Sequence, residues 1–387
     1  GSIQKRGDRT WRISIELDRD PQTGRRRRRW ETFHGTKREA EARLAQLIHE
    51  FETGLAVEPS RLTVADWLRQ WLEQRRPHLR ETTFERYRAS AEGRLIPALG
   101  RLPLQQLKPI HVQQAYARWQ DEGLAPATIA SHHRVLGKAL KDALRLQLIG
   151  RIVTQAVEVP SAHSRTIDLT TIDLQGLIRS LDEAEQPWRT AILLIAYTGM
   201  RRSEALGLEW QDIDLDRFPD AGVGTASIRQ ARTRTAAGAI LVREPKTRAG
   251  VRQVPLLPPV VQALREWRTR QLAHRLASGA DWQAGDFVFS VGPAPMRPDS
   301  LTVWWTRHAR RHGLTIRLHD LRHLAATLMA QYGVPPRVIA QVLGHARASF
   351  TLDVYAGKPD FAVLVDAVQA LGRAYRDARE HSHRPNP

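Results

Sequence analysis

Hydrophobic and polar positions follow a strand pattern and then a helix pattern over the first 57 residues. The segment TWRISIELD alternates apolar and polar residues, a PQTGR turn follows, and RRRRWETFHG leads into TKREAEARLAQLIHEFETG. Alternation with a period of two is typical of a half-buried strand, and the last segment has helical spacing. Thr36 and Glu39 have the spacing of a capping box at the start of that helix. Residues 1–57 are therefore predicted to form a small domain of three short strands and one helix.

Residues 62–155 carry apolar positions at helical spacing almost throughout. Four segments read as helices: TVADWLRQWLEQRR, TTFERYRASAEGRLIPALG, KPIHVQQAYARWQDEG and APATIASHHRVLGKALKDALRLQLI. An all-helical domain is predicted here. Residues 151–166 have little periodicity and are expected to link it to the rest of the chain.

Residues 165–375 mix both patterns. A buried apolar run stops at Gly199, and a new helix is expected from about Arg201. The segment REPKTRAGVRQVPL reads as two strands around a turn, and FAVLVDAVQALGRAYRDA reads as an amphipathic helix. The predicted fold class is multidomain and mainly α with small β-sheets, the third domain being mixed α+β. Residues 376–387 are expected to form a disordered tail.

Composition points to a nucleic-acid partner. The chain has 59 basic and 41 acidic residues and a formal net charge of +18, with an unbroken run from Arg25 to Arg29. It has no cysteine, which excludes disulfides, thiolate metal sites and cysteine nucleophiles. Its apolar runs are too short to span a bilayer, so no membrane partner is expected. We expect a cytoplasmic, nucleoid-associated protein.

Candidate chemistry is concentrated near the C-terminus, in LHDLRH, LGH and TLDVYAG. These segments supply His319, Arg322, His345 and Tyr355. A phenol with a pKa of about 10 is a weak nucleophile at neutral pH, so it needs cations around the phosphate it attacks and a group that accepts its proton. Arginine grips two phosphate oxygens with its planar fork, and histidine moves protons near neutrality. The pattern predicts phosphoryl transfer to a tyrosine.

Two upstream segments extend this candidate site. Arg201 is expected at a helix N-terminus, which favours anions, with Glu204 one turn later to orient it. Lys246 lies at the expected turn, where its ammonium could protonate a leaving oxygen. His319, Asp320 and His323 also allow a metal-site interpretation, but the arginine between them would repel a cation. A reaction that needs no metal and no cofactor is favoured.

The motifs TGMRRSEALGLEW, PKTRAGVRQVPL, HDLRH, LGH and VYAG resemble the active-site boxes of the tyrosine recombinases of the phage-integrase type. Residues 62–155 resemble that family's helical core-binding domain, and residues 1–57 resemble an arm-type DNA-binding domain. The resemblance implies these roles: Arg201 and Arg322 as phosphate clamp, Lys246 as general acid, His319 as proton acceptor or donor, His345 as phosphate hydrogen-bond donor and Tyr355 as nucleophile.

The resemblance also implies where double-stranded DNA is contacted. In the arm-type domain the sheet is expected to enter the major groove through Arg12, Arg27, Arg28 and Arg29, whereas Trp11 and Trp30 are expected in the core. In the helical domain the candidates for backbone contact are Arg80, Thr82, Thr83, Arg86, Arg88, His132, His133 and Lys138.

The implied function is that of an integrase of a phage or integrative mobile element. It would cut and rejoin strands at core and arm attachment sites through a 3′-phosphotyrosyl intermediate and a Holliday junction. A homotetramer formed through the C-terminal helix is expected on paired sites, although that helix could also pack on its own domain. A DNA-bending protein and an excisionase are candidate partners. A type IB topoisomerase and a DNA-binding regulator without covalent chemistry are the alternatives.

Overall fold

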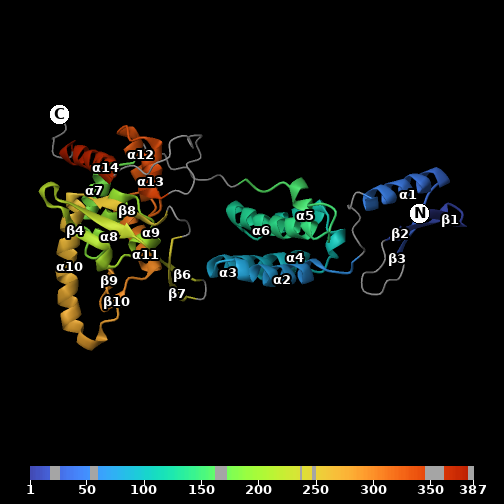
Figure 1. The fold of residues 1–387 in the computed structure, drawn as a ribbon, viewed down its shortest axis with the longest axis horizontal. Helices are drawn as coiled ribbons and strands as arrows, with labels where there is room; N and C mark the ends of the chain where they lie inside the picture. The colour runs from blue at the N-terminus through green and yellow to red at the C-terminus, as the bar shows by residue number, and fades with distance from the viewer. Residues whose placement is uncertain are drawn as a thin grey trace. The chain divides into compact units, whose positions relative to one another are not determined.

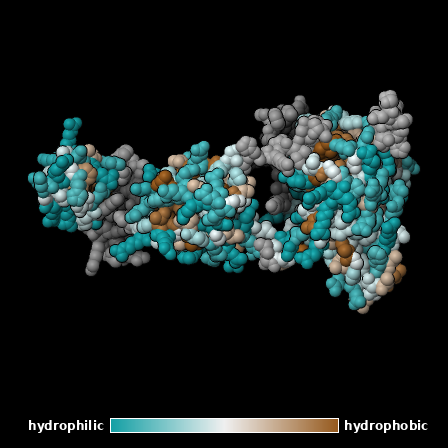
Figure 2. All heavy atoms as spheres, turned by 180° about the vertical axis from the view of Figure 1, so that it is seen from behind, coloured by the Kyte–Doolittle hydropathy of each residue, from teal (hydrophilic) through white to brown (hydrophobic). Residues whose placement is uncertain are grey.

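The chain divides into two compact units, residues 1–164 and 165–387. Figure 1 shows the fold in a computed structural model. It describes residues 1–17, 27–52, 60–161, 172–235, 238–245, 250–344 and 361–381. No helix among these residues is both long enough and apolar enough to cross a membrane. Figure 2 shows a surface that is mostly hydrophilic, with small apolar areas scattered over it.

The N-terminal part of the first unit is a three-stranded antiparallel sheet with one helix, as predicted. Its elements are β1 (Ser2–Gly7), β2 (Thr10–Leu17), β3 (Arg27–His34) and α1 (Lys37–Glu52). Ile13 and Ile15 lie on one face of β2 and pack with Leu47 of α1. The predicted capping box is present, since the Thr36 amide donates to Glu39 Oε2 at 2.7 Å and the Glu39 amide donates to Thr36 Oγ1 at 3.3 Å.

The rest of the first unit is helical, as predicted. Its α-helices are α2 (Val64–Arg75), α3 (Glu81–Ser90), α4 (Ile96–Leu99), α5 (Pro109–Asp121) and α6 (Pro126–Arg145). A short π-helix, Ala91–Leu95, joins α3 to α4, so the single helix predicted for TTFERYRASAEGRLIPALG is made of three consecutive helical segments. Val153 and Val157 are buried in the same core, so the first half of the expected linker belongs to this helical domain instead.

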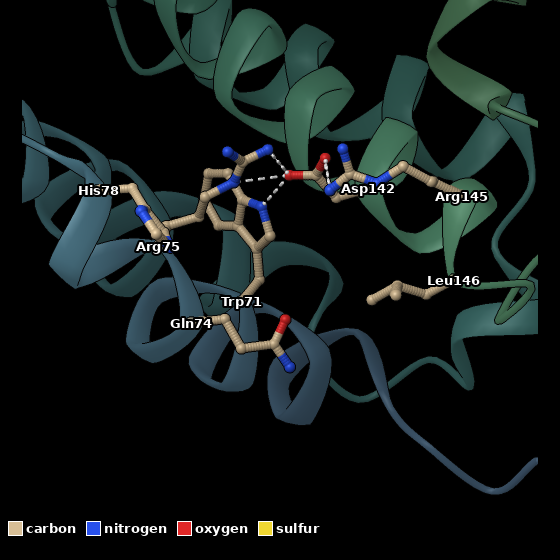
Figure 3. A pocket seen from close by; sticks show the side chains of 7 residues that line it. All are labelled: Trp71, Gln74, Arg75, His78, Asp142, Arg145 and Leu146. Atoms are coloured by element: carbon tan, nitrogen blue, oxygen red, sulfur yellow. Dashed lines mark hydrogen bonds and ion pairs between the residues drawn. The ribbon is translucent and has the colours of Figure 1, made fainter.

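Helices α2 and α6 are joined by a buried carboxylate (Figure 3). Asp142 accepts hydrogen bonds from Trp71 Nε1 at 2.7 Å and from Arg75 Nε at 2.9 Å, and it pairs with Arg145 Nη2 at 3.1 Å. A pocket of about 400 Å³ opens beside these side chains. Burial raises the pKa of Asp142, but the bonds from Arg75 and Trp71 outweigh it and the net shift is downward. Asp142 therefore stays ionised and pairs with two arginines, one at the end of each helix.

The second unit packs helices around small antiparallel sheets. Its α-helices are α7 (Leu174–Asp182), α8 (Trp188–Thr198), α9 (Arg202–Ala205), α10 (Pro258–Ser278), α11 (Pro298–Arg311), α12 (Asp320–Gln331), α13 (Pro336–Leu343) and α14 (Phe361–His381). Its strands are β4 (Ile213–Phe218), β5 (Val223–Ile228), β6 (Ala231–Arg234), β7 (Ile240–Arg243), β8 (Arg252–Leu256), β9 (Ser290–Val291) and β10 (Ala294–Pro295).

Of the two strands expected within residues 243–256, the second is present as β8. The preceding strand, β7, ends at Arg243 at the start of that segment, and it does not form a hairpin with β8. β8 pairs with β5 in the sheet β4-β5-β8, whereas β7 pairs with β6 in a separate ribbon. The reason lies in burial, because Val254 and Leu256 of β8 belong to the main core while β7 has no buried residue. The segment that carries Lys246 therefore connects two different sheets.

Helix α14 packs on its own unit, against α7, α8, α12, α13 and β8. Val368 and Leu371 are buried in the main core, and the Tyr375 ring stacks on Tyr197 with centroids 4.5 Å apart. The helix continues to His381, so the expectation of disorder from residue 376 is wrong for its first six residues. Its last turns are held by an ion pair from Arg379 Nη2 to Asp182 Oδ2 at 2.9 Å.

Candidate active site

The turn that places Arg201 requires a glycine, Gly199. Helix α8 ends at Gly199, which has φ +64°, and Arg201 precedes α9 in an extended conformation. A Cβ atom on Gly199 would lie 2.3 Å from Leu343 Cδ2, so a side chain would also collide with the end of α13. The prediction that Arg201 sits at a helix start is confirmed, although α9 has only four residues.

Glu204 orients Arg201, as predicted. The Arg201 amide donates to Glu204 Oε2 at 3.0 Å, and Arg201 Nη1 donates to Oε1 at 2.6 Å. Arg201 is 40% exposed at its side chain while Glu204 is 3% exposed, so the arginine faces solvent from a buried support. An exposed guanidinium fixed in this way is ready to bind an anion.

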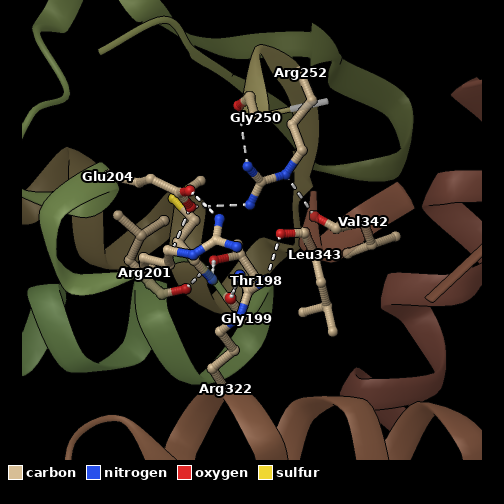
Figure 4. Close-up of polar contacts among 11 residues, drawn as sticks. Thr198, Gly199, Arg201, Glu204, Gly250, Arg252, Arg322, Val342 and Leu343 are labelled. Carbon is tan, nitrogen blue, oxygen red and sulfur yellow. Dashed lines mark hydrogen bonds and ion pairs between the residues drawn. The ribbon is translucent and has the colours of Figure 1, made fainter. Parts of the chain in front are cut away.

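Arg322 lies on α12 with 4% of its surface exposed. Its Nη1 donates to the carbonyl of Gly199 and its Nη2 to the carbonyl of Leu343, both at 2.7 Å (Figure 4). These two bonds bring the turn before Arg201 and the end of α13 to the same guanidinium. Burial, followed by the charge of Arg201, lowers the pKa of Arg322 to about 10, so it remains a cation at neutral pH.

Arg252 is a functional candidate that the sequence reasoning missed. Its side chain is 6% exposed, and its Nη2 donates to Glu204 Oε2 at 3.0 Å. Its Nε donates to the carbonyl of Val342 at 2.7 Å. The segment RQVPL could have indicated this role, because Arg252 lies on the same strand face as Val254 and Leu256. A charge on a buried face requires a partner.

Glu204 thus lies between two arginines, and Figure 4 shows its carboxylate pointing toward both. Burial raises the pKa of Glu204, but Arg252 and then Arg201 outweigh burial and the net shift is downward. The carboxylate is ionised at neutral pH. The charges of Arg201, Arg252 and Arg322 together with Glu204 leave this cluster with a net charge of +2, which we call the arginine cluster.

His319 immediately precedes α12, and its ring meets the His323 ring edge-on, with centroids 5.0 Å apart. Partial burial, then the charges of His323 and Arg322, lower the pKa of His319 below its ordinary value of 6.5. A neutral imidazole can accept a proton. The alternative metal-site interpretation loses its carboxylate, because both oxygens of Asp320 accept hydrogen bonds from Arg317.

Three of the predicted catalytic residues, Lys246, His345 and Tyr355, lie outside the described residues. The described elements around them still belong to the site. β8 begins six residues after Lys246, at Arg252. The Leu343 carbonyl that Arg322 binds lies two residues before His345.

In the N-terminal sheet, the expected DNA-contacting arginines differ in their surroundings. The guanidinium of Arg12 lies 3.9 Å above the ring of Trp30, which is 46% exposed. The expectation that Trp30 belongs to the core is therefore wrong. Trp30 pairs with Ser14, on the sheet face opposite Ile13 and Ile15. Trp11 is half-buried and donates to the Gly35 carbonyl at 2.9 Å.

Arg28 is exposed on the same sheet and pairs with Glu16 at 2.6 Å. Arg27 and Arg29 are residues of β3, and their side chains lie outside the described residues. In this sheet an exposed aromatic ring under a guanidinium presents a flat, cationic surface.

The helical candidates fall into two groups. Exposed side chains belong to Arg80, Arg86, Arg88 and Lys138. Half-buried side chains belong to Thr82, Thr83, His132 and His133. The two histidines bond inside the domain, His132 with Ser90 Oγ at 2.7 Å and His133 with Tyr116 Oη at 3.0 Å. The exposed cations are the better placed of these candidates for DNA phosphates.

Comparison with known families gives three matches. The family described as "Phage integrase family" matches residues 168–360. The "Phage integrase, N-terminal SAM-like domain" matches residues 63–120, and the "Arm DNA-binding domain" matches residues 2–51. Together the three matched segments cover most of the chain, and the segment of residues 168–360 contains the arginine cluster.

Similar proteins carry related names. A "Tyrosine recombinase XerC-like" protein of Caldanaerobacter subterraneus is 26% identical over 369 residues, covering 91% of this chain and 93% of its own. The integrase of Mycobacterium phage L5 is 27% identical, with 74% of this chain and 73% of its own covered.

Two solved structures share the fold. The Tn1549 transposon integrase in complex with transposon right end DNA has a TM-score of 0.61 at 21% identity, covering 80% of this chain and 99% of its own. A lambda integrase tetramer bound to a Holliday junction has a TM-score of 0.51 at 16% identity, covering 90% and 92%.

Proposed function

Because the chain belongs to the phage integrase family and is thus a tyrosine-type site-specific recombinase, we propose that it integrates and excises the DNA of a phage or integrative element. The strands pass through a covalent 3′-phosphotyrosyl intermediate and a Holliday junction. The arm-type domain supports a second class of contact, at arm sites separate from the core sites where strands are cut.

The observation that carries this proposal is the arginine cluster. A phosphodiester has one negative charge, and attack by a tyrosine oxygen adds a second at the transition state. The cluster's net charge of +2 matches that doubly charged state better than it matches the ground state. Charge that is already oriented before the reaction lowers the barrier without reorganisation, which is the main catalytic effect in phosphoryl transfer.

Each residue of the proposed site has its own role in the reaction. Arg201 and Arg322 bind the non-bridging oxygens, with His345 as a third donor. The Tyr355 oxygen passes its proton to His319 and forms a bond to phosphorus while the bond from phosphorus to the 5′ oxygen breaks. Lys246 supplies the proton that the leaving 5′ oxygen takes. The 5′-hydroxyl of a partner strand then attacks the phosphotyrosine and restores Tyr355, so no metal or cofactor is consumed.

The assembly we propose is a homotetramer on two paired sites. The fold relationship to a lambda integrase tetramer on a Holliday junction supports it. Contact between subunits through the C-terminal helix requires that α14 exchange its packing or present its other face, because its apolar face is buried on its own unit. A DNA-bending protein and an excisionase remain the proposed accessory partners.

The test is covalent capture of DNA. The full chain is incubated with EDTA and nicked DNA fragments from its source genome, and SDS-resistant protein–DNA adducts are collected and sequenced. Tyr355→Phe should form none. Tyr332→Phe is the matched control, because Tyr332 bonds Asp377 away from the arginine cluster and its loss should leave adduct formation unchanged.

Each outcome decides between the functions. Adducts at a few recurring sequences, lost in Tyr355→Phe alone, support the integrase. Adducts spread over all sequences, together with relaxation of a supercoiled plasmid by the protein alone, would indicate topoisomerase activity. DNA binding at low salt without an adduct would favour the regulator.

A further inference from the structure

Two buried arginines from different elements hold the end of one helix. Arg252 of β8 binds the carbonyl of Val342, and Arg322 of α12 binds the next carbonyl, that of Leu343. These are the last two residues of α13, which is followed by its C-cap Gly344 at φ +70°. Carbonyls in the last turn of a helix lack partners within the helix, and cations there interact favourably with its dipole.

Arg252 also reaches the support of Arg201. Its Nη2 binds Glu204 Oε2, the same oxygen that accepts the Arg201 amide. One guanidinium therefore connects the turn that carries Arg201 with the last turn of α13, at Val342, two residues before Gly344. Its backbone lies on the strand that follows the Lys246 segment. Three of the sequence motifs that carry the proposed chemistry meet at this side chain.

We infer that Arg252 is a positioning residue of the recombinase reaction, which sets the relative placement of Arg201 and the end of α13. This inference rests on the proposed function of the site. All three guanidinium nitrogens of Arg252 donate to acceptors of its own unit, namely the carbonyls of Val342 and Gly250 and the carboxylate of Glu204, so we assign it no contact with DNA. It acts through Glu204 on one side and through the Val342 carbonyl on the other.

A lysine cannot replace this arginine. The three bonds of Arg252 leave the planar guanidinium in different directions, to Glu204, to Val342 and to the carbonyl of Gly250 at 3.2 Å. An ammonium is a compact charge without a planar fork, so Arg252→Lys keeps the charge but not the geometry. Arg252→Lys therefore tests the placement of the guanidinium N–H groups while it keeps the positive charge.

The experiment measures the rate of adduct formation on the nicked genomic fragments, together with affinity for a labelled duplex of arbitrary sequence. Arg252→Lys should slow adduct formation about 100-fold, the cost expected from misplacing a reacting group by about 1 Å. Affinity should change less than about twofold, because Arg252 does not contact DNA. Arg265→Lys is the matched control, since Arg265 pairs with Asp216 on the exposed surface and its rate should stay unchanged.

A double-substitution cycle separates positioning from a general loss of stability. If Arg252 acts partly through Glu204, combining Arg252→Met with Glu204→Gln should slow the reaction by clearly less than the product of the two single effects. Multiplied effects in the double variant, or an unchanged rate in Arg252→Lys, would overturn the inference. Absence of adduct with the unmodified protein would instead overturn the proposed function, and this inference with it. Circular dichroism melting of every variant confirms that each one is folded.

Discussion

At the scale of residues, the site buries two positively charged side chains close to a third. Arg252 and Arg322 are nearly inaccessible, and each is stable because carbonyls or a carboxylate accept its N–H groups. Glu204 is the carboxylate that pairs with Arg252 and with Arg201. Its bonds leave Arg201 partly exposed, so one cation of the cluster faces solvent while the others are internal.

Arg322→Lys tests the paired carbonyl bonds directly. One ammonium cannot reproduce the planar fork that binds Gly199 and Leu343, so the clamp loses its orientation. We expect adduct formation to fall by about 100- to 1000-fold, as for removal of one donor in a preorganised site. The measurement is single-turnover trapping on a nicked substrate. A rate within threefold of the unmodified protein would contradict the role.

The pH dependence of adduct formation tests His319. A proton acceptor must be neutral, and partial burial together with the charges of His323 and Arg322 lowers the pKa of His319 from its ordinary value of 6.5. The rate should therefore fall as pH decreases, with the midpoint of the decline below pH 6.5, as the ring becomes protonated. Rates at closely spaced pH values give this profile, and His319→Asn should remove the acid limb. A midpoint above pH 6.5 would assign the titration to another group.

At the scale of elements, turns and helix ends position the site. Gly199 permits close contact with α13, and the two buried arginines bind the last carbonyls of that helix. In the first unit, a comparable arrangement at Asp142 joins α2 to α6. In both places a short polar contact fixes two helices that apolar packing brings together.

Gly199→Ala should lower both stability and activity. The residue would carry a Cβ atom at φ +64° and 2.3 Å from Leu343 Cδ2, which is expected to cost about 1–3 kcal/mol. The drop in Tm measures the loss of stability, and the decrease in adduct formation measures the loss of activity. Gly93→Ala is the control, because a Cβ atom there meets nothing within 4 Å in a helical segment, so Tm should stay equal or rise. Equal Tm values for the two variants would contradict the close contact.

Asp142→Asn should destabilise the helical domain. The substitution removes the counter-charge of Arg75, which is 27% exposed, and of Arg145, which is 70% exposed, and losing these charge-assisted hydrogen bonds is expected to cost about 1–3 kcal/mol. Calorimetry of the full chain should show a lower first transition, while Asp121→Asn on the exposed surface should not. A transition at the original temperature would show that the pair contributes little.

Sequence reasoning succeeded where a periodic pattern and a local motif coincide. The capping box at Thr36, the helices of residues 62–155 and the Arg201–Glu204 pair all follow from spacing within a few residues. It failed where partners are distant along the chain. The pairing of β8 with β5, the bonds of Arg252 and the exposure of Trp30 depend on sheet register and packing that no local pattern contains.

At the scale of the whole molecule, positive charge is the dominant property. With a formal net charge of +18 and exposed arginines in the arm-type sheet, the helical domain and the arginine cluster, the chain offers cations in each of its matched segments. Binding by phosphate neutralisation depends on the release of counterions and carries little sequence information. Affinity for arbitrary DNA and selection of a cleavage site are therefore separate properties.

Affinity for a duplex of arbitrary sequence should fall steeply with salt. If the chain neutralises about 6–10 phosphates, its affinity should drop about 10³- to 10⁵-fold between 50 and 200 mM salt. Fluorescence anisotropy of a labelled duplex gives the slope. Tyr355→Phe should have the same slope, because the nucleophile adds no charge. A slope near zero would mean that apolar contacts, and not charge, hold the DNA.

The cis packing of α14 has a consequence for the nucleophile. Tyr355 stands six residues before Phe361, the first residue of that helix, and six residues of extended chain span about 20 Å at most. While α14 stays anchored in its own core, Tyr355 is tethered within that radius of Phe361. If Tyr355 is the nucleophile, as proposed, an anchored α14 would confine its attack to phosphates within that distance of its own subunit, and attack further away would require α14 to leave its core.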